Sequence, residues 1–389
     1  MNPRRKVCVV TGSRAEYGLL YSLLQDIAAD SNFDLQVIAT GMHLSPEFGL
    51  TYRQIEADGF AIGAKVEMLL SADTPVAVTK SLGLGIIGFA DALNSLAPDI
   101  VVVLGDRFEI LAAAQAAMLA RIPLAHIHGG ETSEGAYDEG IRHAISKMAH
   151  WHFVAAEPYR QRVVQLGEAP QRVFNVGGPG LDHLRRTQLL SRKELEQSLG
   201  MRLLEPLLLV TYHPVTLGKD APETAMEELL AALREFNDAC IVFTYPNADS
   251  GGRALRQMIE RFVADYPQRM RGYVSLGQLR YLSLMRHANA IVGNSSSGLI
   301  EAPALKKATV NVGDRQKGRL KASSVIDAPE RRAEIAGAIR LALSAEFRAS
   351  LPQTRSHYGF GNASAAIVRQ LKADLPEIQK PFFDISHGY

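Results

Sequence analysis

The sequence has few cysteines, no excess of charge of either sign and no long apolar run. Lys and Arg total 42 against 41 for Asp and Glu, so no overall field attracts nucleic acid or an anionic membrane. Cys8 and Cys240 lie in separate apolar runs, which excludes a disulfide framework and favours a reducing compartment. The apolar run at residues 7–10 is too short for a secretion signal, and no apolar stretch approaches bilayer-spanning length. We therefore expect a soluble, cytoplasmic protein.

Several motifs of cofactor chemistry are also missing. The first apolar run is followed by TGSRAEYG at residues 11–18, which is neither a dinucleotide-binding GxGxxG fingerprint nor a Walker loop. The sequence has no HExxH motif and no Asp-rich calcium loop, so its pattern does not support a metal site. Any anion site must therefore come from a local arrangement of side chains and backbone groups.

Short apolar runs alternate with longer helix-like segments along the whole chain. This alternation predicts α/β domains with parallel sheets that helices cover on both faces. The expected strands are residues 7–10, 35–39, 100–104, 124–128, 152–155 and 173–176 in the first half, and 207–212, 241–245, 273–276, 290–292 and 309–312 in the second. Two such series predict two doubly wound domains, with the change near the polar residues 188–206.

Ligands of doubly wound sheets bind at the carboxyl ends of the strands, and we expect a cleft between the two domains. The segment GNSSSGLIE at residues 293–301 follows an apolar run and is expected to open a helix. Its backbone N–H groups, with Ser295 and Ser296, suit a phosphate at a helix N-terminus, and Glu301 suits ribose hydroxyls. An ordinary helix N-cap explains the same serines equally well.

Charged residues follow two of the expected strands in the first half. Arg14 comes after a glycine turn at the start of a helix, where a guanidinium suits a phosphate or a carboxylate. A capped helix with a surface arginine is the alternative. Asp106 and Arg107 follow the strand at 100–104, as in many active sites, although a structural ion pair has the same pattern.

The densest polar stretch is residues 125–143. It contains His126, His128 and Glu131, then Asp138 at the start of a helix that also bears Arg142. Carboxylates gathered in a cleft shift one another's pKa and serve as acid and base. A polar loop with capping acids is the alternative.

The strands of the second half are followed by further polar residues. His213 follows the strand at 207–212, Asn247 follows the next strand, and Arg315 lies in the loop after residue 312. A structural histidine and solvated loops explain each of these singly. Their shared position at strand ends favours one common site.

Taken together, these motifs resemble the hydrolysing UDP-N-acetylglucosamine 2-epimerases of sialic and related nonulosonic acid synthesis. The resemblance covers nearly the whole chain and is carried by the order and spacing of TGSRAEY (11–17), GDRFE (105–109), HIHGGE (126–131), DEGIRH (138–143), YHPVT (212–216), GNSSSGLIE (293–301), GDRQ (313–316) and YGFGNAS (358–364).

The resemblance implies the glycosyltransferase-B architecture of two Rossmann-like domains. The expected domains are residues 1–188 and 189–362, and a C-terminal helix within 363–389 returns to the first domain. It also implies a homodimer or homotetramer that needs neither nicotinamide nor metal, and that acts on a UDP-sugar rather than on nucleic acid or membrane.

The reaction implied by the resemblance has two steps. A base removes the proton at C2 of the sugar while UDP leaves C1, and water then adds to the resulting glycal. Matching motifs imply catalytic roles for Asp106, Glu131 and Asp138, and contact of His213 with the departing diphosphate. The implied UDP ligands are Arg14, Asn247, Ser295, Ser296, Glu301 and Arg315, with Arg107 and Arg142 as further candidates.

One departure from the family pattern concerns His128, because some members have Glu at this position. Either Glu131 takes over that role or His128 supplies base chemistry itself. The form HIHGGE is similar to the branch that acts on UDP-N,N′-diacetylbacillosamine in legionaminic acid synthesis, so two substrates stay open. Alternative functions are a non-hydrolysing epimerase, a glycosyltransferase and a catalytically silent UDP-sugar sensor.

Overall fold

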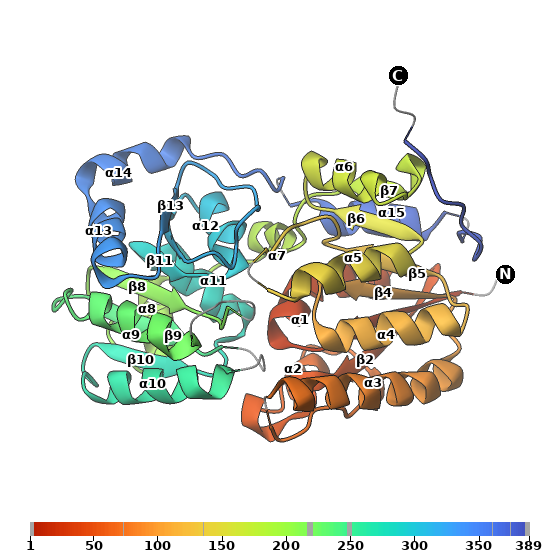
Figure 1. The fold of residues 1–389 in the computed structure, drawn as a ribbon, viewed down its shortest axis with the longest axis horizontal. Coiled ribbons are helices and arrows are strands. Elements are labelled where there is room, and N and C mark those ends of the chain that lie inside the picture. The colour runs from red at the N-terminus through yellow and green to blue at the C-terminus, as the bar shows by residue number, and fades with distance from the viewer. Residues whose placement is uncertain are drawn as a thin grey trace. The chain divides into compact units, whose positions relative to one another are not determined.

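The computed structural model describes residues 4–72, 74–134, 136–215, 221–246, 251–359, 361–373 and 375–385. The chain folds into two compact units, each with its own sheet (Figure 1). Unit 1 comprises Met1–Glu131, Asp138–Arg185 and Tyr358–Tyr389, and unit 2 comprises Thr132–Tyr137 and Arg186–His357. The short segment Thr132–Tyr137 groups with unit 2, where the Thr132 carbonyl accepts a hydrogen bond of 2.9 Å from Arg319 Nε.

The described strands of unit 1 form a parallel sheet in the order β3-β2-β1-β4-β5-β6-β7. They are β1 (Arg5–Thr11), β2 (Phe33–Thr40), β3 (Ile62–Val66), β4 (Ile100–Leu104), β5 (Leu124–Ile127), β6 (Trp151–Val154) and β7 (Val173–Asn175). The helices are α1 (Arg14–Ala29), α2 (Tyr52–Ala57), α3 (Pro75–Leu96), α4 (Phe108–Leu119), α5 (Asp138–Met148), α6 (Glu157–Gln165), α7 (Gly180–Arg186) and α15 (Ala363–Leu371).

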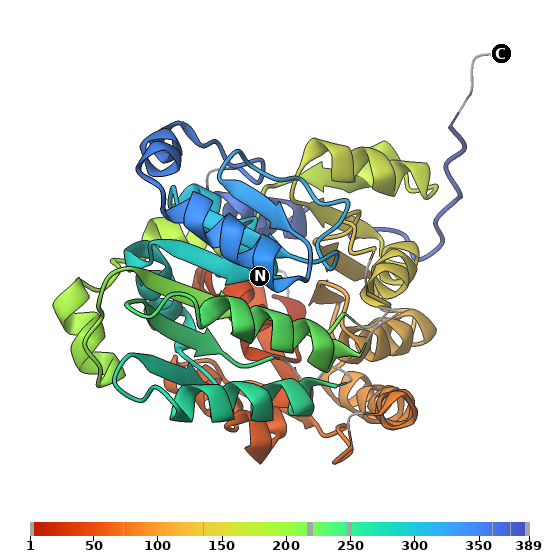
Figure 2. The same cartoon turned by 60° about the vertical axis from the view of Figure 1, so that its left-hand side comes forward.

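Alternate residues of each strand in unit 1 enter separate cores on the two faces of the sheet. Val7 and Val9 of β1 pack in the core that includes α1 and α15, whereas Cys8 and Val10 pack in the core that includes α3, α4 and α5. Helices α3, α4 and α5 lie side by side in Figures 1 and 2. The apolar runs are therefore continuous because both faces of the sheet are buried.

Unit 2 repeats this plan with a smaller parallel sheet in the order β10-β9-β8-β11-β12-β13. Its strands are β8 (Leu207–Thr211), β9 (Cys240–Thr244), β10 (Met270–Tyr273), β11 (Ala290–Gly293), β12 (Ala308–Val312) and β13 (Val325–Ala328). Its helices are α8 (Arg192–Leu199), α9 (Pro222–Leu233), α10 (Gly252–Ala264), α11 (Gly277–His287), α12 (Glu301–Ala304), α13 (Arg332–Leu343) and α14 (Ala345–Ser350).

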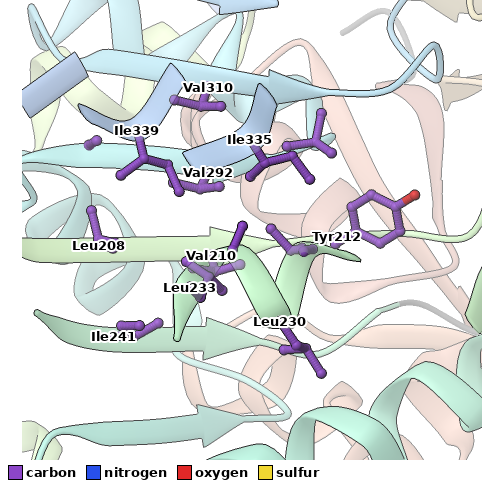
Figure 3. Packing of buried hydrophobic residues seen from close by; sticks show 14 of the residues in the cluster. Leu208, Val210, Tyr212, Leu230, Leu233, Ile241, Val292, Val310, Ile335 and Ile339 are labelled. Atoms are coloured by element: carbon purple, nitrogen blue, oxygen red, sulfur yellow. The ribbon is translucent and has the colours of Figure 1, made fainter. Parts of the chain in front are cut away.

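The larger core of unit 2 lies between its sheet and helices α9, α10 and α13. Figure 3 shows Leu208 and Val210 of β8 beside Ile241 of β9, with Ile335 and Ile339 of α13 packed over the sheet. The opposite face is covered by α8 and α11. The sequence prediction of two doubly wound α/β domains is confirmed.

The C-terminal helix α15 belongs to unit 1, although the preceding 172 residues, Arg186–His357, belong to unit 2. Ile367 and Leu371 of α15 pack in the same core as α1. Its first turn is held by Asp182, whose carboxylate accepts hydrogen bonds from the backbone N–H groups of Ala363 (2.9 Å) and Ser364 (2.5 Å). The expected return of the last helix to the first domain is confirmed.

Helix α3 corrects the expectation that no apolar stretch is long enough for a bilayer. Its 22 residues are long and apolar enough to cross a membrane by length and composition alone. The core helix of a folded domain meets the same criterion, because Phe89 and Leu93 of α3 are buried in the core that it shares with α4. The opposite face of α3 exposes Val76, Leu84 and Ile87.

Three strands differ from the sequence prediction. β3 and β13 were not expected, and β10 lies at Met270–Tyr273 rather than at 273–276. All three are short strands with partly exposed residues, and β3 and β13 each end a sheet. Strands of this kind lack the continuous apolar run on which the prediction depended.

Candidate functional site

The acids expected in the first half gather at the carboxyl ends of β4 and β5. These strands are parallel neighbours, so the residues that follow them lie at one edge of the unit 1 sheet. Asp106 comes two residues after β4, and His128 and Glu131 follow β5. Asp138 is the first residue of α5, where a carboxylate is favoured by the helix dipole.

Arg142 of α5 links Asp106 to the backbone of Glu131. Its side chain is fully buried, and its guanidinium contacts the Asp106 carboxylate, the Glu131 carbonyl (2.9 Å) and Glu139 Oε2 (3.0 Å). A buried guanidinium with several carboxylate and carbonyl partners fixes their positions, since it stays charged and its donors are planar. Arg142 was a further candidate for UDP binding, and in unit 1 it is directed to the acids.

His128 and Glu131 form a couple rather than two alternatives. His128 Nδ1 contacts Glu131 Oε1, and both side chains are buried. His128 has a left-handed backbone (φ 67°), which is uncommon for a residue with a Cβ and aims its ring at Glu131. Nε2 of His128 has no hydrogen-bond partner among the described residues. The ring is therefore held through Nδ1, while Nε2 is buried without a partner among the described residues.

His126 supports the turn that presents Asp106. Its Nε2 is 2.7 Å from the Gly105 carbonyl, and its Nδ1 is 3.1 Å from Ser146 Oγ of α5. Burial lowers the pKa of His126 to about 3, so the imidazole is neutral at physiological pH and Nε2–H donates to Gly105. One histidine thus links the turn at Asp106 to the helix that bears Arg142.

The first strand end carries a second buried group of charges. Ser13 and Glu16 form a capping box at the start of α1, where Arg14 is the first residue and is partly exposed. Burial, and then the neighbouring Glu109, raise the pKa of Glu16 to about 8. Arg107 Nε donates to Glu109 Oε1 at 2.7 Å, so the predicted UDP ligand Arg107 has Glu109 as an ionic partner.

In unit 2 the residues after β8 and β11 are joined by an asparagine. His213 and Asn294 are both buried. The Asn294 side chain accepts from the His213 backbone N–H (2.7 Å) and donates to the His213 carbonyl (2.8 Å). The Asn294 carbonyl accepts from Arg315 Nη1 (3.2 Å) and Gln316 Nε2 (2.7 Å). His213, Arg315 and the serine segment therefore lie together at one edge of the sheet.

The serine segment opens a shorter helix than expected. Ser295 caps a 3₁₀ turn, Ser296–Gly298, by accepting from the Ser297 N–H at 3.4 Å. The following helix α12 has only four residues and begins at Glu301, which is buried. Lys306 has a left-handed φ of 57°, which ends the helical backbone soon afterwards. The expected helix is present only as the four residues of α12, so a phosphate there would depend mainly on local N–H and hydroxyl groups.

One predicted site residue cannot be placed, and two polar residues beside the site were not predicted. Asn247 lies outside the described residues. The sequence motifs did not indicate roles for Asn294 and Gln316. Both are buried polar side chains, and the available signal for Asn294 is its position directly after the apolar strand β11. Within the described ranges no group of three His, Cys, Asp or Glu side chains is arranged to hold a metal ion.

A family model described as UDP-N-acetylglucosamine 2-epimerase matches residues 25–372. The chain is 44% identical over 324 residues, covering 83% of this chain and 84% of the relative, to a GDP/UDP-N,N′-diacetylbacillosamine 2-epimerase (hydrolyzing) of Campylobacter jejuni. It is 37% identical over 381 residues, covering 98% and 97%, to the polysialic acid biosynthesis protein P7 of Escherichia coli.

Solved structures give the same fold. The crystal structure of a UDP-GlcNAc 2-epimerase from Neisseria meningitidis, bound to UDP-GlcNAc, has a TM-score of 0.77 and 19% sequence identity. The match covers 94% of this chain and 99% of that chain. At this identity the likeness concerns the fold of the two sheets and their helices.

Proposed function

Because the chain belongs to the UDP-N-acetylglucosamine 2-epimerase family, we propose that it is a hydrolysing epimerase that converts UDP-GlcNAc to ManNAc and UDP. The observation that carries the proposal is the group of acids around Arg142 in unit 1, with the His128–Glu131 couple beside it. A protein that only binds a nucleotide sugar has no use for this group.

The reaction follows from the chemistry of the acids. A base takes the proton from C2, the electron pair forms the C1=C2 bond, and the C1–O bond breaks with its electrons on the UDP oxygen. Water then adds its hydroxyl to C1, while a proton returns to C2 on the opposite face. Each step moves a proton at carbon or at the leaving oxygen, so it needs positioned acids and bases.

In unit 1 we assign removal of the proton from C2 of the sugar to the His128–Glu131 couple. Glu131 on Nδ1 favours the tautomer with its proton on that nitrogen, which leaves a lone pair on Nε2. Asp106, held by Arg142, and Asp138 at the start of α5 supply the carboxylates that stabilise positive charge at C1 and deliver water.

In unit 2 we assign the residues that bind UDP. Arg315, Ser295 and Ser296 bind the phosphates, Glu301 binds the ribose, and His213 donates to the departing diphosphate. The hydrogen bonds that join Asn294 to His213 and Arg315 support this assignment. Arg14, Arg107 and Asn247 are further proposed ligands of UDP.

The same reaction on UDP-N,N′-diacetylbacillosamine is the second candidate. It is favoured by the 44% identical relative from Campylobacter jejuni, which is named for that activity. The roles assigned above concern C1 and C2 of the sugar, whereas the two substrates differ at C4 and C6. These roles therefore apply equally to both substrates.

The test incubates the enzyme with each nucleotide sugar and follows products by proton and phosphorus NMR. Release of free ManNAc together with UDP from UDP-GlcNAc supports the proposal. Faster turnover of the diacetamido substrate moves the assignment to the second candidate. Formation of UDP-ManNAc without free UDP, or no reaction of either substrate, contradicts it, and transfer that requires an added acceptor indicates a glycosyltransferase.

We also propose that the enzyme is a soluble, cytoplasmic homodimer. Cys8 and Cys240 are buried free thiols, as suits a reducing compartment. The outer face of α3 exposes Val76 (65%), Leu84 (44%) and Ile87 (66%), and a second copy is the proposed cover.

Light scattering on the purified protein tests the dimer. Ile87→Glu should shift the mass towards the monomer. Leu341→Glu is the matched control, because Leu341 is an equally apolar, 49% exposed helix residue in unit 2. Monomeric wild-type protein, or equal dissociation by both variants, contradicts the interface.

A further inference from the structure

Asn294 makes hydrogen bonds through both its side chain and its backbone. It is fully buried and follows β11 directly. Its Oδ1 accepts from the His213 N–H at 2.7 Å, its Nδ2 donates to the His213 carbonyl at 2.8 Å, and its own N–H donates to the Thr211 carbonyl at 3.1 Å. The ends of β8 and β11 are therefore joined beyond the last residues of their register, Thr211 and Gly293.

The local sequence is built for this approach. Gly293 has φ 129°, a conformation that residues with a Cβ rarely adopt, and a Cβ there would overlap the Thr211 carbonyl. The glycine lets the ends of β8 and β11 approach closely. The side-chain amide of Asn294 can then bond to both the N–H and the carbonyl of His213. The side-chain amide of Asn or Gln offers a donor and an acceptor on one carbon atom, and Asn has the shorter reach.

The backbone of Asn294 makes a second connection. Its carbonyl accepts from Arg315 Nη1 and from Gln316 Nε2, at 3.2 and 2.7 Å. Gln316 is itself buried. One residue thus contacts the segment that carries His213 and the segment that carries Arg315, and Ser295 follows it directly in the chain.

We propose that Asn294 is a positioning residue that fixes His213 relative to Arg315, so that the diphosphate is bound and protonated in one geometry. This inference rests on the proposed function, in which both residues contact UDP. Asn294 acts through His213 and Arg315 and touches no reacting atom. Its loss should affect binding and turnover together, because both partners move.

The opposite ends of the same two strands provide a matched control. Asn289 precedes β11, and its Oδ1 accepts from the Leu207 N–H at 2.7 Å while its N–H donates to the Leu207 carbonyl at 2.8 Å. Asn289 thus joins β8 and β11 as Asn294 does, but at the amino ends, away from His213. A purely structural role for Asn294 predicts equal effects at both positions.

The experiment compares Asn294→Ala with Asn289→Ala in the full-length enzyme. Ala removes the two side-chain hydrogen bonds to His213 at the first position and the side-chain hydrogen bond to Leu207 at the second. We expect Asn294→Ala to raise the Kd for UDP by about tenfold, to lower kcat by about tenfold or more, and to shift the pH–rate profile. Asn289→Ala should lower the melting temperature while Kd, kcat and the profile stay within about twofold.

Two outcomes overturn the proposal: unchanged Kd and kcat in a folded Asn294→Ala enzyme, or equal kinetic losses in both variants. Should Asn294→Ala fail to fold, Gln316→Met removes one donor to the Asn294 carbonyl at similar volume. We expect it to raise the Kd for UDP by about threefold or more, and an unchanged Kd refutes the connection. A wild-type enzyme that binds UDP without releasing it from UDP-GlcNAc contradicts the proposed function instead.

Discussion

Glu168 is predicted to be the main source of acid sensitivity in unit 1. It is buried, and its carboxylate accepts from Lys147 Nζ (2.6 Å), His152 Nε2 (3.0 Å) and Lys380 Nζ (2.6 Å). Burial alone raises the pKa of Glu168, but the hydrogen bonds from His152 and the two lysines outweigh it and lower the pKa to about 2. The perturbation is Glu168→Gln, which keeps the shape and removes the charge.

The sign and size of the effect follow from this pKa. A carboxyl group whose pKa is lowered on folding stabilises the folded state at pH values above its ordinary pKa of 4.5. This contribution is lost as the pH falls from 4.5 to about 2. At about 1.4 kcal/mol for each pH unit, the difference corresponds to about 3 kcal/mol at neutral pH. Glu168→Gln should therefore cost about 3 kcal/mol at pH 7 and progressively less below pH 4.5.

The assay uses the single tryptophan of the chain. Trp151 is buried in β6 next to His152, so its fluorescence reports the unfolding of unit 1. Urea titrations at pH 7, 5 and 3 should show a lower midpoint for Glu168→Gln at pH 7 and converging midpoints in acid.

Glu235→Gln in unit 2 is the control for this experiment. Glu235 also pairs with two cations, Arg332 and Arg340, but at the surface. Its loss should leave the Trp151 transition unchanged. Equal stability of Glu168→Gln and wild type at pH 7, or a difference at pH 3 as large as that at pH 7, would refute the reasoning.

Three further predictions concern the two strand-end groups. Asp106→Asn should lower turnover by about 100-fold or more while the Kd for UDP stays within a few-fold, and unchanged turnover removes Asp106 from the mechanism. Arg315→Ala should weaken UDP binding by about 1–3 kcal/mol in calorimetry, and no loss refutes its assignment. Gly293→Ala should destabilise unit 2 by about 1–3 kcal/mol in thermal unfolding, whereas Gly337→Ala, with open space around it, should be neutral or stabilising; equal melting curves contradict the strain argument.

Much of the fold could be predicted because the central strands have both faces buried. β1, β4, β8 and β11 contain continuous apolar runs, and Asp106 follows β4 as His213 follows β8. Since parallel strands end at a common edge of the sheet, the residues that follow each strand could be placed at that edge without knowing which residues they contact. Edge strands β3 and β13 lack such runs because one or both faces are partly exposed.

The partners within the site could not be predicted from the sequence. Asp106 and Arg142 are 36 residues apart, and His213 and Asn294 are 81 apart, so only the folded sheet brings them into contact. Arg107 shows the same limit at short range, because an ion pair with the adjacent Asp106 was one of two alternatives and the structure adds a contact with Glu109. Local spacing identifies polar strand ends, but tertiary packing selects which groups pair.

Hydrogen exchange at C2 of the sugar is the most direct measurement of the central claim that unit 1 provides acid–base chemistry for a UDP-sugar. The enzyme is supplied with UDP-GlcNAc in heavy water, and the free sugar is examined by proton NMR and mass spectrometry. The account predicts ManNAc with one deuterium at C2, released together with UDP. Product that retains the original proton at C2, or UDP released with unepimerised GlcNAc, would contradict it.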